Sequence, residues 1–326
     1  MIINMSHGSG GKETNELIKL VFAKYFKNEI LDKMEDAAVI DIRGKIAFST
    51  DSFVVAPLFF KGGDIGRLAI CGTVNDLLMQ GAMPRYLTVG FIIEEGMDTS
   101  TLTKIVKSMA AAAEEAKIII VAGDTKVIEG KGGLYINTTG IGIIQEDINI
   151  SASNCCVGDA IILSGTLGEH HGCILSSRMN IKNNITSDVQ PLNSAIFGLL
   201  NNGIRVKAMR DVTRGGLGTI LNELVESSCC GANIYENKIP VNMEVKGLCD
   251  ILGLDSIYMG NEGKFLAIID KEDENSAIDI LHNIKASKEA AVIGYIRRGI
   301  GVTMITKLGG RRIIDVLYGE GLPRIC

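Results

Sequence analysis

Four aspartates in the first half of the chain are the side chains best suited to chemistry. Each stands beside a glycine turn or at the end of an expected strand, where ligands collect in α/β proteins. Several carboxylates without a matching basic cluster favour a hard divalent cation such as Mg²⁺, which usually arrives with substrate phosphates. One such aspartate alone is most simply a turn or helix cap, but the set predicts a magnesium–nucleotide site. Its members are Asp36, Asp51, Asp76 and Asp124, with the amide of Asn75 beside the third.

The last residue, Cys326, is a second candidate for chemistry because it joins a thiol to the terminal carboxylate. Gly319 and Gly321 loosen the approach to it, and Pro323 stiffens the last step. The nine residues from Tyr318 span roughly 30 Å when extended. A thiolate is a strong nucleophile that can carry an acyl-type group. A frayed terminus is the other explanation, and the tail alone does not decide between them.

A glycine-rich stretch lies near the start of the chain and precedes an expected helix at 13–26. Gly8, Gly10, Gly11 and Lys12 have the composition of an anion-binding loop at a helix N-terminus. The stretch matches neither the Walker A nor the dinucleotide-binding pattern, because Glu13 follows the lysine. A flexible N-terminal arm would have the same composition.

The elements that position these residues alternate between strands and helices, which predicts an α/β fold with α+β character. A polar stretch without periodicity at 145–158 places a domain boundary near residue 150. We therefore expect domains at 1–149 and 150–315 and a mobile tail at 316–326. The expected strands are 37–41, 45–50, 86–93, 118–122, 134–144, 160–164, 206–209, 232–236, 264–270 and 291–297. The expected helices are 62–80, 100–116, 172–179, 192–201, 217–227, 245–252 and 272–284.

Composition excludes several classes of protein. The 326 residues carry a net charge of −5, which argues against nucleic acid as a partner. No apolar run approaches the length of a membrane span. The eight cysteines include no C-x-x-C pair, so a reduced, cytoplasmic protein with free thiols is expected.

Eight short motifs are spread over nearly the whole chain: Ser-His-Gly-Ser-Gly-Gly at 6–11, Glu-Asp-Ala-Ala-Val at 35–39, Ser-Thr-Asp-Ser-Phe-Val at 49–54, Gly-Gly-Asp-Ile-Gly-Arg-Leu-Ala at 62–69, Gly-Thr-Val-Asn-Asp-Leu at 72–77, Ala-Gly-Asp-Thr-Lys-Val at 122–127, Met-Arg-Asp-Val-Thr-Arg-Gly-Gly-Leu at 209–217 and Asn-Glu-Gly at 261–263. With these motifs the chain resembles the AIR synthase-related (PurM-like) ATP-binding proteins. Within that superfamily the terminal Pro-Arg-Ile-Cys is similar to the branch of carbamoyl dehydratases that serve [NiFe]-hydrogenase maturation. The loop Gly-Glu-His-His-Gly at 168–172 departs from the branch, which more often has Asp-His-Gly, so no role is assigned to it.

The resemblance implies a two-domain PurM-like architecture. It implies a homodimer in which N-terminal sheets pair into a barrel-like core, followed by a C-terminal α/β sandwich. It also implies a reaction in which a carbamoyl group on Cys326 is dehydrated with ATP and Mg²⁺ to a thiocyanate. That group would supply cyanide ligands to the hydrogenase iron. The implied partners are the carbamoyltransferase HypF and the HypC–HypD iron scaffold complex.

The resemblance also distributes roles among the residues. It implies Asp36, Asp51, Asp76 and Asp124 as metal ligands, and Cys326, Lys126 and Glu262 as catalytic residues. Glu262 would accept the N–H protons of the carboxamide, and Lys126 would stabilise developing oxyanion charge. Asp211, Thr213 and Arg214 stay open between a structural network and substrate contact. The implied nucleotide-binding residues are Gly8, Gly10, Gly11, Lys12, Asp51, Asn75, Asp76 and Asp124.

The sequence leaves two alternative functions open. One is a related ATP-dependent enzyme of aminoimidazole ribonucleotide, thiamine phosphate or selenophosphate synthesis, which would share the carboxylates but has no obvious need of a terminal cysteine. The other is a non-catalytic carrier, which would need the terminal thiol but not the nucleotide site.

Overall fold

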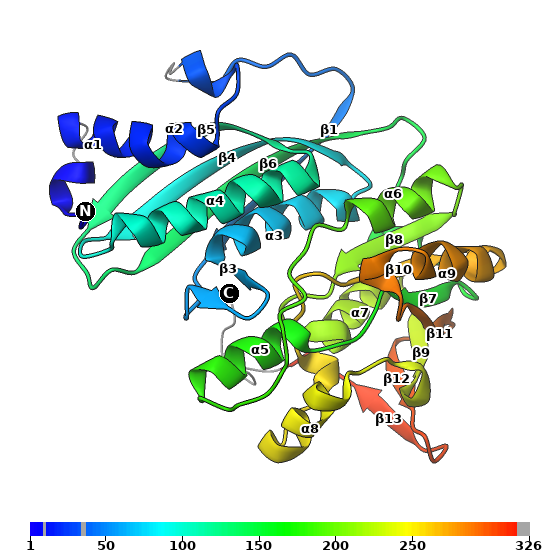
Figure 1. Cartoon of the computed structure of the whole chain (residues 1–326). Coiled ribbons are helices and arrows are strands. Elements are labelled where there is room, and N and C mark those ends of the chain that lie inside the picture. The colour runs from blue at the N-terminus through cyan, green and yellow to red at the C-terminus, as the bar shows by residue number, and fades with distance from the viewer. Residues whose placement is uncertain (9–10, 34–36, 318–326) are drawn as a thin grey trace.

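The computed structural model describes residues 1–8, 11–33 and 37–317. Two sheets dominate it, and each has helices packed against it (Figure 1). The expected α/β character is confirmed. The elements of the N-terminal half are η1 (Met5–Gly8), α1 (Lys12–Leu17), η2 (Ile18–Phe22), α2 (Ala23–Tyr25), η3 (Leu31–Lys33), β1 (Lys45–Phe53), β2 (Phe59–Phe60), β3 (Gly63–Asp64), α3 (Ile65–Met79), β4 (Met83–Glu94), α4 (Thr99–Ala116), β5 (Ile119–Ile128) and β6 (Leu134–Ile144).

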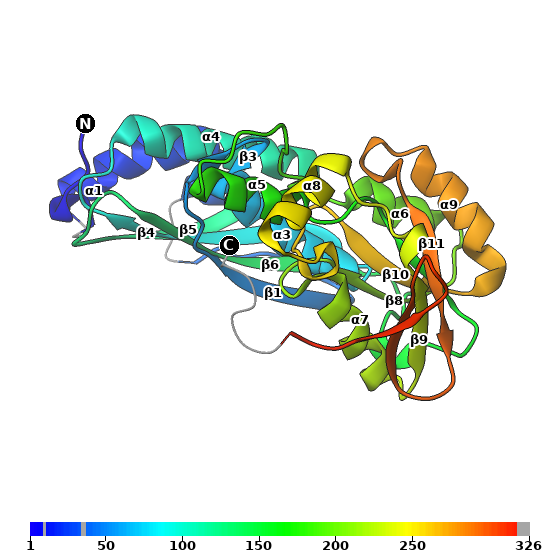
Figure 2. The ribbon, with the colours of Figure 1, turned by 90° about the horizontal axis from the view of Figure 1, so that it is seen from below.

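The N-terminal sheet has the strand order β1-β6-β4-β5. Only the β4–β5 pair is parallel, because α4 provides the crossover between these strands. Figure 2 shows α3 and α4 on one side of the sheet, and no labelled helix of the N-terminal half on the other, open side. Phe48 is 63% exposed on that open face, and Ile46, Ile92 and Ile119 are also exposed. The sheet is therefore buried on one side only, and β1 and β5 are its edge strands.

The C-terminal sheet has the strand order β13-β12-β9-β11-β7-β10-β8. Alternation along β7 sends Ala160 and Ile162 toward the core shared with the N-terminal half, and Ile161 and Leu163 toward a second core under α7. One apolar core thus runs without a break across the expected boundary near residue 150. The elements of this half are η4 (Ala152–Asn154), β7 (Ala160–Leu163), α5 (Glu169–Arg178), α6 (Asn193–Asn201), β8 (Val206–Asp211), α7 (Gly216–Ser227), β9 (Gly231–Tyr235), η5 (Glu236–Lys238), α8 (Met243–Leu252), η6 (Ser256–Tyr258), β10 (Phe265–Ile269), η7 (Lys271–Asp273), α9 (Glu274–His282), η8 (Lys285–Ser287), β11 (Ala291–Arg297), β12 (Gly301–Ile305) and β13 (Arg311–Ile314).

Several expected boundaries are wrong. The stretch 37–41 forms no strand, because no neighbouring strand pairs with it. β1 continues to Phe53 and β5 to Ile128, so Asp51 and Asp124 lie inside strands and not at their ends. Strands β12 and β13 were not expected. An alternating pattern predicts a strand only where a partner completes the hydrogen bonds, and that partner is chosen by the tertiary fold.

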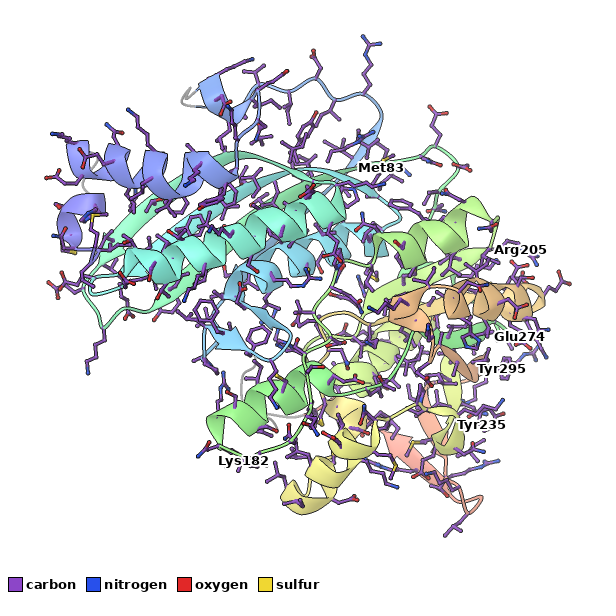
Figure 3. All side chains as sticks on the ribbon, viewed as in Figure 1. Met83, Lys182, Arg205, Tyr235, Glu274 and Tyr295 are labelled. Carbon is purple, nitrogen blue, oxygen red and sulfur yellow. The ribbon has the colours of Figure 1, made fainter. Side chains whose placement is uncertain are left out.

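The charged residues at 271–274 mark a helix start, as expected from the preference for acids in a first turn. Arg205 stabilises this helix start through ion pairs of 3.0 Å to Asp270 and 2.9 Å to Asp273. Tyr295 of β11 donates a hydrogen bond of 3.0 Å to Glu274. Figure 3 shows Arg205, Glu274 and Tyr295 along this edge of the C-terminal half, away from the N-terminal sheet.

Helix α3 depends on a buried cap. The Asp64 carboxylate accepts hydrogen bonds from the backbone N–H of Gly66 at 2.7 Å and of Arg67 at 3.1 Å. We expect Asp64→Ala to lower the free energy of unfolding by about 1–2 kcal/mol. Asp98 occupies the same position in α4 but makes no side-chain cap bond, so Asp98→Ala is the matched control. Chemical denaturation measures both, and equal losses would contradict the cap.

Candidate active site at the domain junction

Two of the predicted aspartates meet where β1 faces α3. Alternation along β1 turns Ser49 and Asp51 toward the helix, while Phe48 and Thr50 face the open side. Ser49 Oγ donates a hydrogen bond of 2.6 Å to Asp76 Oδ2. Asp51 Oδ1 accepts from the backbone N–H of Ser52 at 2.8 Å. Its Oδ2 lies 3.9 Å from the position that a Cβ on Gly72 of α3 would occupy.

The C-terminal half adds two further acids to this pair. Asp211 ends β8, and Glu262 lies in the loop before β10. Burial, followed by the charge of Asp76, raises the pKa of Asp211 to about 7. Burial and the charges of Asp211 and Asp188 raise the pKa of Glu262 well above its ordinary value. The four carboxyl groups therefore form one electrostatic cluster, which we call the junction acids: Asp51, Asp76, Asp211 and Glu262.

Basic side chains stand beside the junction acids. Burial and the charge of Asp51 raise the pKa of Asp76, while Arg210 and Arg214 act in the opposite direction. Arg214 lowers the pKa of Asp51 in the same way, although burial dominates and raises it. Both arginines are exposed at the end of β8, so they are free to contact an anion such as a nucleotide phosphate.

Asn75 does not present its amide to open space. Its Nδ2 donates to the carbonyl oxygens of Gln190 at 3.1 Å and of Glu262 at 3.4 Å. Its Oδ1 accepts from the backbone N–H of Leu192 at 3.0 Å. The amide in the middle of α3 therefore ties two segments of the C-terminal half to the N-terminal half. This placement gives Asn75 a structural task that the expected nucleotide contact did not include.

The donor set fits a divalent cation that is completed by a ligand. Within residues 1–8, 11–33 and 37–317, no group of three or more histidine, cysteine or acidic side chains has metal-binding spacing. Mg²⁺ is usually held by one or two carboxylates together with substrate phosphates, and keeps several waters. Asp51 and Asp76 suit that mode, since a cation between them would relieve the repulsion that raises the pKa of Asp76.

Asp124 and Lys126 lie elsewhere. Their side chains project from β5 onto the open face of the sheet, 68% and 63% exposed, and Lys126 Nζ lies 3.1 Å from Asp124 Oδ2. Asp124 pairs with Gly90 of β4, Gly90 with Asn137 of β6, and Asn137 with Ser52 of β1. Within one chain the sheet thus separates Asp124 and Lys126 from Asp51 and Asp76, which face α3.

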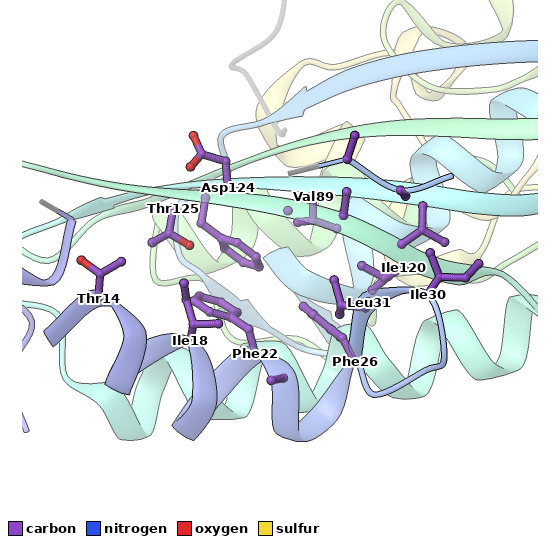
Figure 4. Close-up of a pocket in the computed structure, with 17 residues that line it drawn as sticks. Thr14, Ile18, Phe22, Phe26, Ile30, Leu31, Val89, Ile120, Asp124 and Thr125 are labelled. Atoms are coloured by element: carbon purple, nitrogen blue, oxygen red, sulfur yellow. The ribbon is translucent and has the colours of Figure 1, made fainter. Parts of the chain in front are cut away.

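The glycine stretch lies against β5 as well. A Cβ on Gly8 would come within 2.5 Å of the backbone nitrogen of Val127, so only glycine permits this contact. Lys12 is exposed and pairs with Glu16 at 3.8 Å. A cavity of about 230 Å³, lined mainly by apolar side chains such as Phe22 and Phe91, lies between this N-terminal region and β4–β5. Figure 4 shows the Asp124 carboxylate pointing away from the helix that bounds the cavity.

Three predicted site residues, Gly10, Asp36 and Cys326, lie outside the described residues. Asp188 and Lys264 were not predicted at all. Both side chains are buried, and Lys264 Nζ lies 3.3 Å from Asp188 Oδ2. The Asn-Glu-Gly motif at 261–263 was the only sequence signal near them. The sequence does not assign a role to Asp211, although the Met-Arg-Asp motif that carries it comes at the end of an expected strand.

The Glu169-His170-His171 loop begins α5 and lies beside the same motif. Asn261 Nδ2 lies 3.3 Å from Glu169 Oε2, and His170 Nδ1 lies 2.8 Å from Ser187 Oγ. Burial lowers the pKa of His171 to about 4. These contacts support packing of the loop around residue 261.

Comparison with known proteins identifies the class. Residues 34–144 match the family model of the AIR synthase related protein, N-terminal domain, and residues 157–307 match that of the C-terminal domain. The chain therefore belongs to the AIR synthase-related proteins, and the expected two-domain PurM-like architecture is confirmed.

Within that class the chain is a member of the HypE carbamoyl dehydratase family. It is 44% identical over 331 residues to carbamoyl dehydratase HypE of Azotobacter vinelandii, covering 99% of this chain and 97% of the relative. A crystal structure of the hydrogenase maturation protein HypE in complex with ATP superposes with a TM-score of 0.95 at 42% identity, covering 99% of both chains. A HypE–HypF complex structure matches with a TM-score of 0.82 at 45% identity, covering 92% of this chain and 99% of the other.

The pKa of Asp211 makes stability depend on pH. Its ordinary value is 3.8 and its value in the fold is about 7, so the folded carboxyl keeps its proton over a range in which the unfolded one loses it. The free energy of unfolding should therefore fall as pH rises from about 4 to about 7. In the presence of a chelator, Asp211→Asn should be more stable than the wild type at about pH 8, by on the order of 2–4 kcal/mol, with the difference vanishing toward pH 4.

Urea denaturation across that pH range measures the effect. Asp250→Asn, at an exposed position of α8, is the control and should show no such trend. A stability difference for Asp211→Asn that does not change with pH would contradict the shifted carboxyl.

Proposed function

We propose that this chain is an ATP-dependent carbamoyl dehydratase that converts a carbamoyl group on Cys326 to a thiocyanate for the cyanide ligands of the [NiFe]-hydrogenase iron. The observation that carries the proposal is the junction-acid cluster in a chain that belongs to the HypE family over nearly its whole length. The name of the A. vinelandii relative gives the activity, and an ATP complex is known for a structural relative.

The reaction needs a leaving group on a carboxamide. The carboxamide oxygen attacks the γ-phosphorus of ATP and ADP leaves, which forms a C–O–P linkage. The C–O bond then breaks and inorganic phosphate departs, while nitrogen loses its two protons and the C≡N bond forms. Glu262 is the candidate acceptor of these protons, and Lys126 is the candidate for stabilising negative charge on oxygen.

Asp51 and Asp76 would hold Mg²⁺ at the junction, with Asp36 and Asp124 as the further candidate ligands. The bound ion would neutralise negative charge on the triphosphate as the phosphoryl group transfers. Arg210 and Arg214 would add positive charge beside the same acids. Gly8, Gly10, Gly11 and Lys12 would cover the phosphates, and the apolar cavity beside them suits the nucleotide base.

A homodimer would bring the strand that carries Asp124 and Lys126 next to the strand that carries Asp51. Each chain exposes an apolar sheet face and two free edge strands, β1 and β5. Face-to-face pairing into a closed barrel would set the β5 edge of one chain next to the β1 edge of the other and remove both edges. The β5 strand that carries Asp124 and Lys126 of the partner subunit would then run beside the β1 strand that carries Asp51. The open apolar face supports this arrangement.

The remaining assignments follow from the same proposal. HypF would load the carbamoyl group, since a HypE relative forms a complex with HypF. The HypC–HypD complex would receive the cyano group. No helix in the described part of the chain is both long and apolar enough to cross a bilayer, and its seven cysteines are free thiols. We place the protein in the cytoplasm on the strength of its free cysteines.

Cys326→Ala tests the carrier residue. We expect it to abolish thiocyanate formation and leave ATP affinity unchanged, because the thiol bears the substrate and does not hold the nucleotide. Mass spectrometry of the protein after loading with HypF and addition of ATP should show the dehydrated adduct on the last peptide only. Cys173→Ala, at a buried cysteine, is the control. An adduct on another cysteine, or dehydration without ATP consumption, would refute the proposal.

Subunit complementation tests the composite site. Asp76→Ala and Lys126→Ala should each be inactive alone as homodimers. In a mixed dimer both changes fall in one site and the other site is intact, so random mixing should restore about a quarter of wild-type activity. An equal mixture of Asp76→Ala with Asp51→Ala is the control and should stay inactive, since both residues come from the same chain. No recovery in the first mixture, or monomers alone in sedimentation, would contradict the shared site.

A further inference from the structure

The loop 261–264 is unusual because charged side chains follow one another in a buried place. Asn261, Glu262 and Lys264 are all buried, and Gly263 lies between the two charged residues. Buried charges destabilise a fold unless they are paired and hydrogen-bonded. The contacts of this loop therefore indicate what holds it in place.

Asp188 makes most of those contacts. Its Oδ1 accepts from the backbone N–H of Glu262 at 3.1 Å, and its Oδ2 from that of Gly263 at 3.2 Å. Oδ2 also accepts from Asn261 Nδ2 at 3.0 Å and from Lys264 Nζ at 3.3 Å. One buried carboxylate thus contacts every residue of the loop. Burial alone would raise its pKa, but Lys264, His170 and these hydrogen bonds outweigh burial and lower it, so Asp188 stays charged.

The fit between the loop and Asp188 is close. A Cβ on residue 263 would lie 1.9 Å from the carbonyl oxygen of Asp188, so only glycine fits at this position. Asn75 Nδ2 and the backbone N–H of Gln190 approach the carbonyl oxygen of Glu262 at 3.4 and 3.5 Å. Both peptide groups of Glu262 are therefore held, its N–H by Asp188 and its carbonyl by Asn75 and Gln190.

The segment that carries Asp188 is itself anchored on the N-terminal half. It runs between α5 and α6, and the N–H of Ser187 donates to the carbonyl of Lys61 at 2.8 Å. Arg67 Nε donates to the carbonyl of Val189 at 3.0 Å. Both Lys61 and Arg67 belong to the region at the start of α3, the helix that carries Asp76. A continuous chain of contacts therefore relates the position of Glu262 to that of Asp76.

We propose that Asp188, with its charge balanced by Lys264, is the positioning residue that holds the Glu262 backbone so that its carboxyl group meets Asp51, Asp76 and Asp211. The proposal rests on the proposed function, in which Glu262 takes protons from the carboxamide. In this proposal Asp188 acts through Glu262 and not on the substrate or the nucleotide. It sets the place from which Glu262 acts, and a displacement of about 1 Å in such a group reduces rates by up to about a hundredfold.

Three variants separate positioning from simple stability. Asp188→Asn keeps the shape of the side chain but replaces one carboxylate oxygen with an amide NH₂ group. That group is a donor and cannot accept a hydrogen bond from the loop. Lys264→Met leaves the Asp188 charge unpaired. Asp188→Asn combined with Lys264→Met removes both charges, so its stability should recover relative to Lys264→Met, because no unpaired buried charge remains. Asp159→Asn is the matched control, since Asp159 is a buried aspartate that accepts from the backbone N–H of Cys156 at 2.7 Å, away from Glu262.

The experiment uses the full-length protein loaded by HypF and follows one turnover of dehydration at saturating ATP, with ATP affinity and thermal stability measured in parallel. Asp188→Asn and the double variant should both dehydrate about tenfold to a hundredfold more slowly, with ATP affinity within about twofold of wild type. Asp159→Asn should react at the wild-type rate. The double variant matters most, since recovered stability with a low rate is a result that a structural role does not produce.

Two outcomes would overturn the proposal, and they differ. Wild-type dehydration by the double variant, with Glu262→Gln inactive, would show that Asp188 does not position Glu262 while the proposed function stands. Wild-type dehydration by Glu262→Gln would remove Glu262 from the reaction, so that the catalytic assignment in the proposed function and the task given to Asp188 would fail together.

Discussion

Repulsion among four carboxyl groups at the domain junction is the constraint on which the rest of the structure depends. Asp51 and Asp76 come from one half of the chain and Asp211 and Glu262 from the other, and burial raises the pKa of each. Such a cluster stays assembled only if the two halves are firmly joined. The joint is an apolar core that runs from α3 into β7, β10 and α6, together with hydrogen bonds from Asn75.

A site built this way suits a polyanion that arrives with a cation. Without ligand the acids repel one another, and burial together with this repulsion favours the protonated forms of Asp211 and Glu262. Positive charge entering the cluster would favour their ionised forms, so a ligand and its cation would change the acid–base state of Glu262 as they bind. Asp188 and Lys264 form an ion pair, and Asp188 contacts the loop through the backbone N–H groups of Glu262 and Gly263, not through the Glu262 carboxyl group.

The architecture was largely predictable because hydrophobic periodicity is local. Helices α3, α4 and α7 and strands β4, β6 and β11 fall close to their expected ranges. The predictions are wrong where pairing with a neighbouring strand determines which residues form a strand. The stretch 37–41 has no pairing partner, and β5 continues past Ala122. The predicted strand ends are wrong at Asp51 and Asp124, which lie inside β1 and β5.

The sequence by itself determined the class of protein, because its motifs are runs of neighbouring residues. Such runs can be recognised without knowing which residues are in contact. It also predicted Asp51, Asp76 and Glu262 as site residues, and the structure brings these three acids into one cluster. Only the tertiary structure decided that Asp124 and Lys126 face the opposite side of the sheet, since the side on which a strand residue points depends on its register. Only the tertiary structure revealed Asp188 and Lys264, which lie 76 positions apart in the chain and meet at 3.3 Å. Contacts between distant segments leave no local pattern for a single sequence to display.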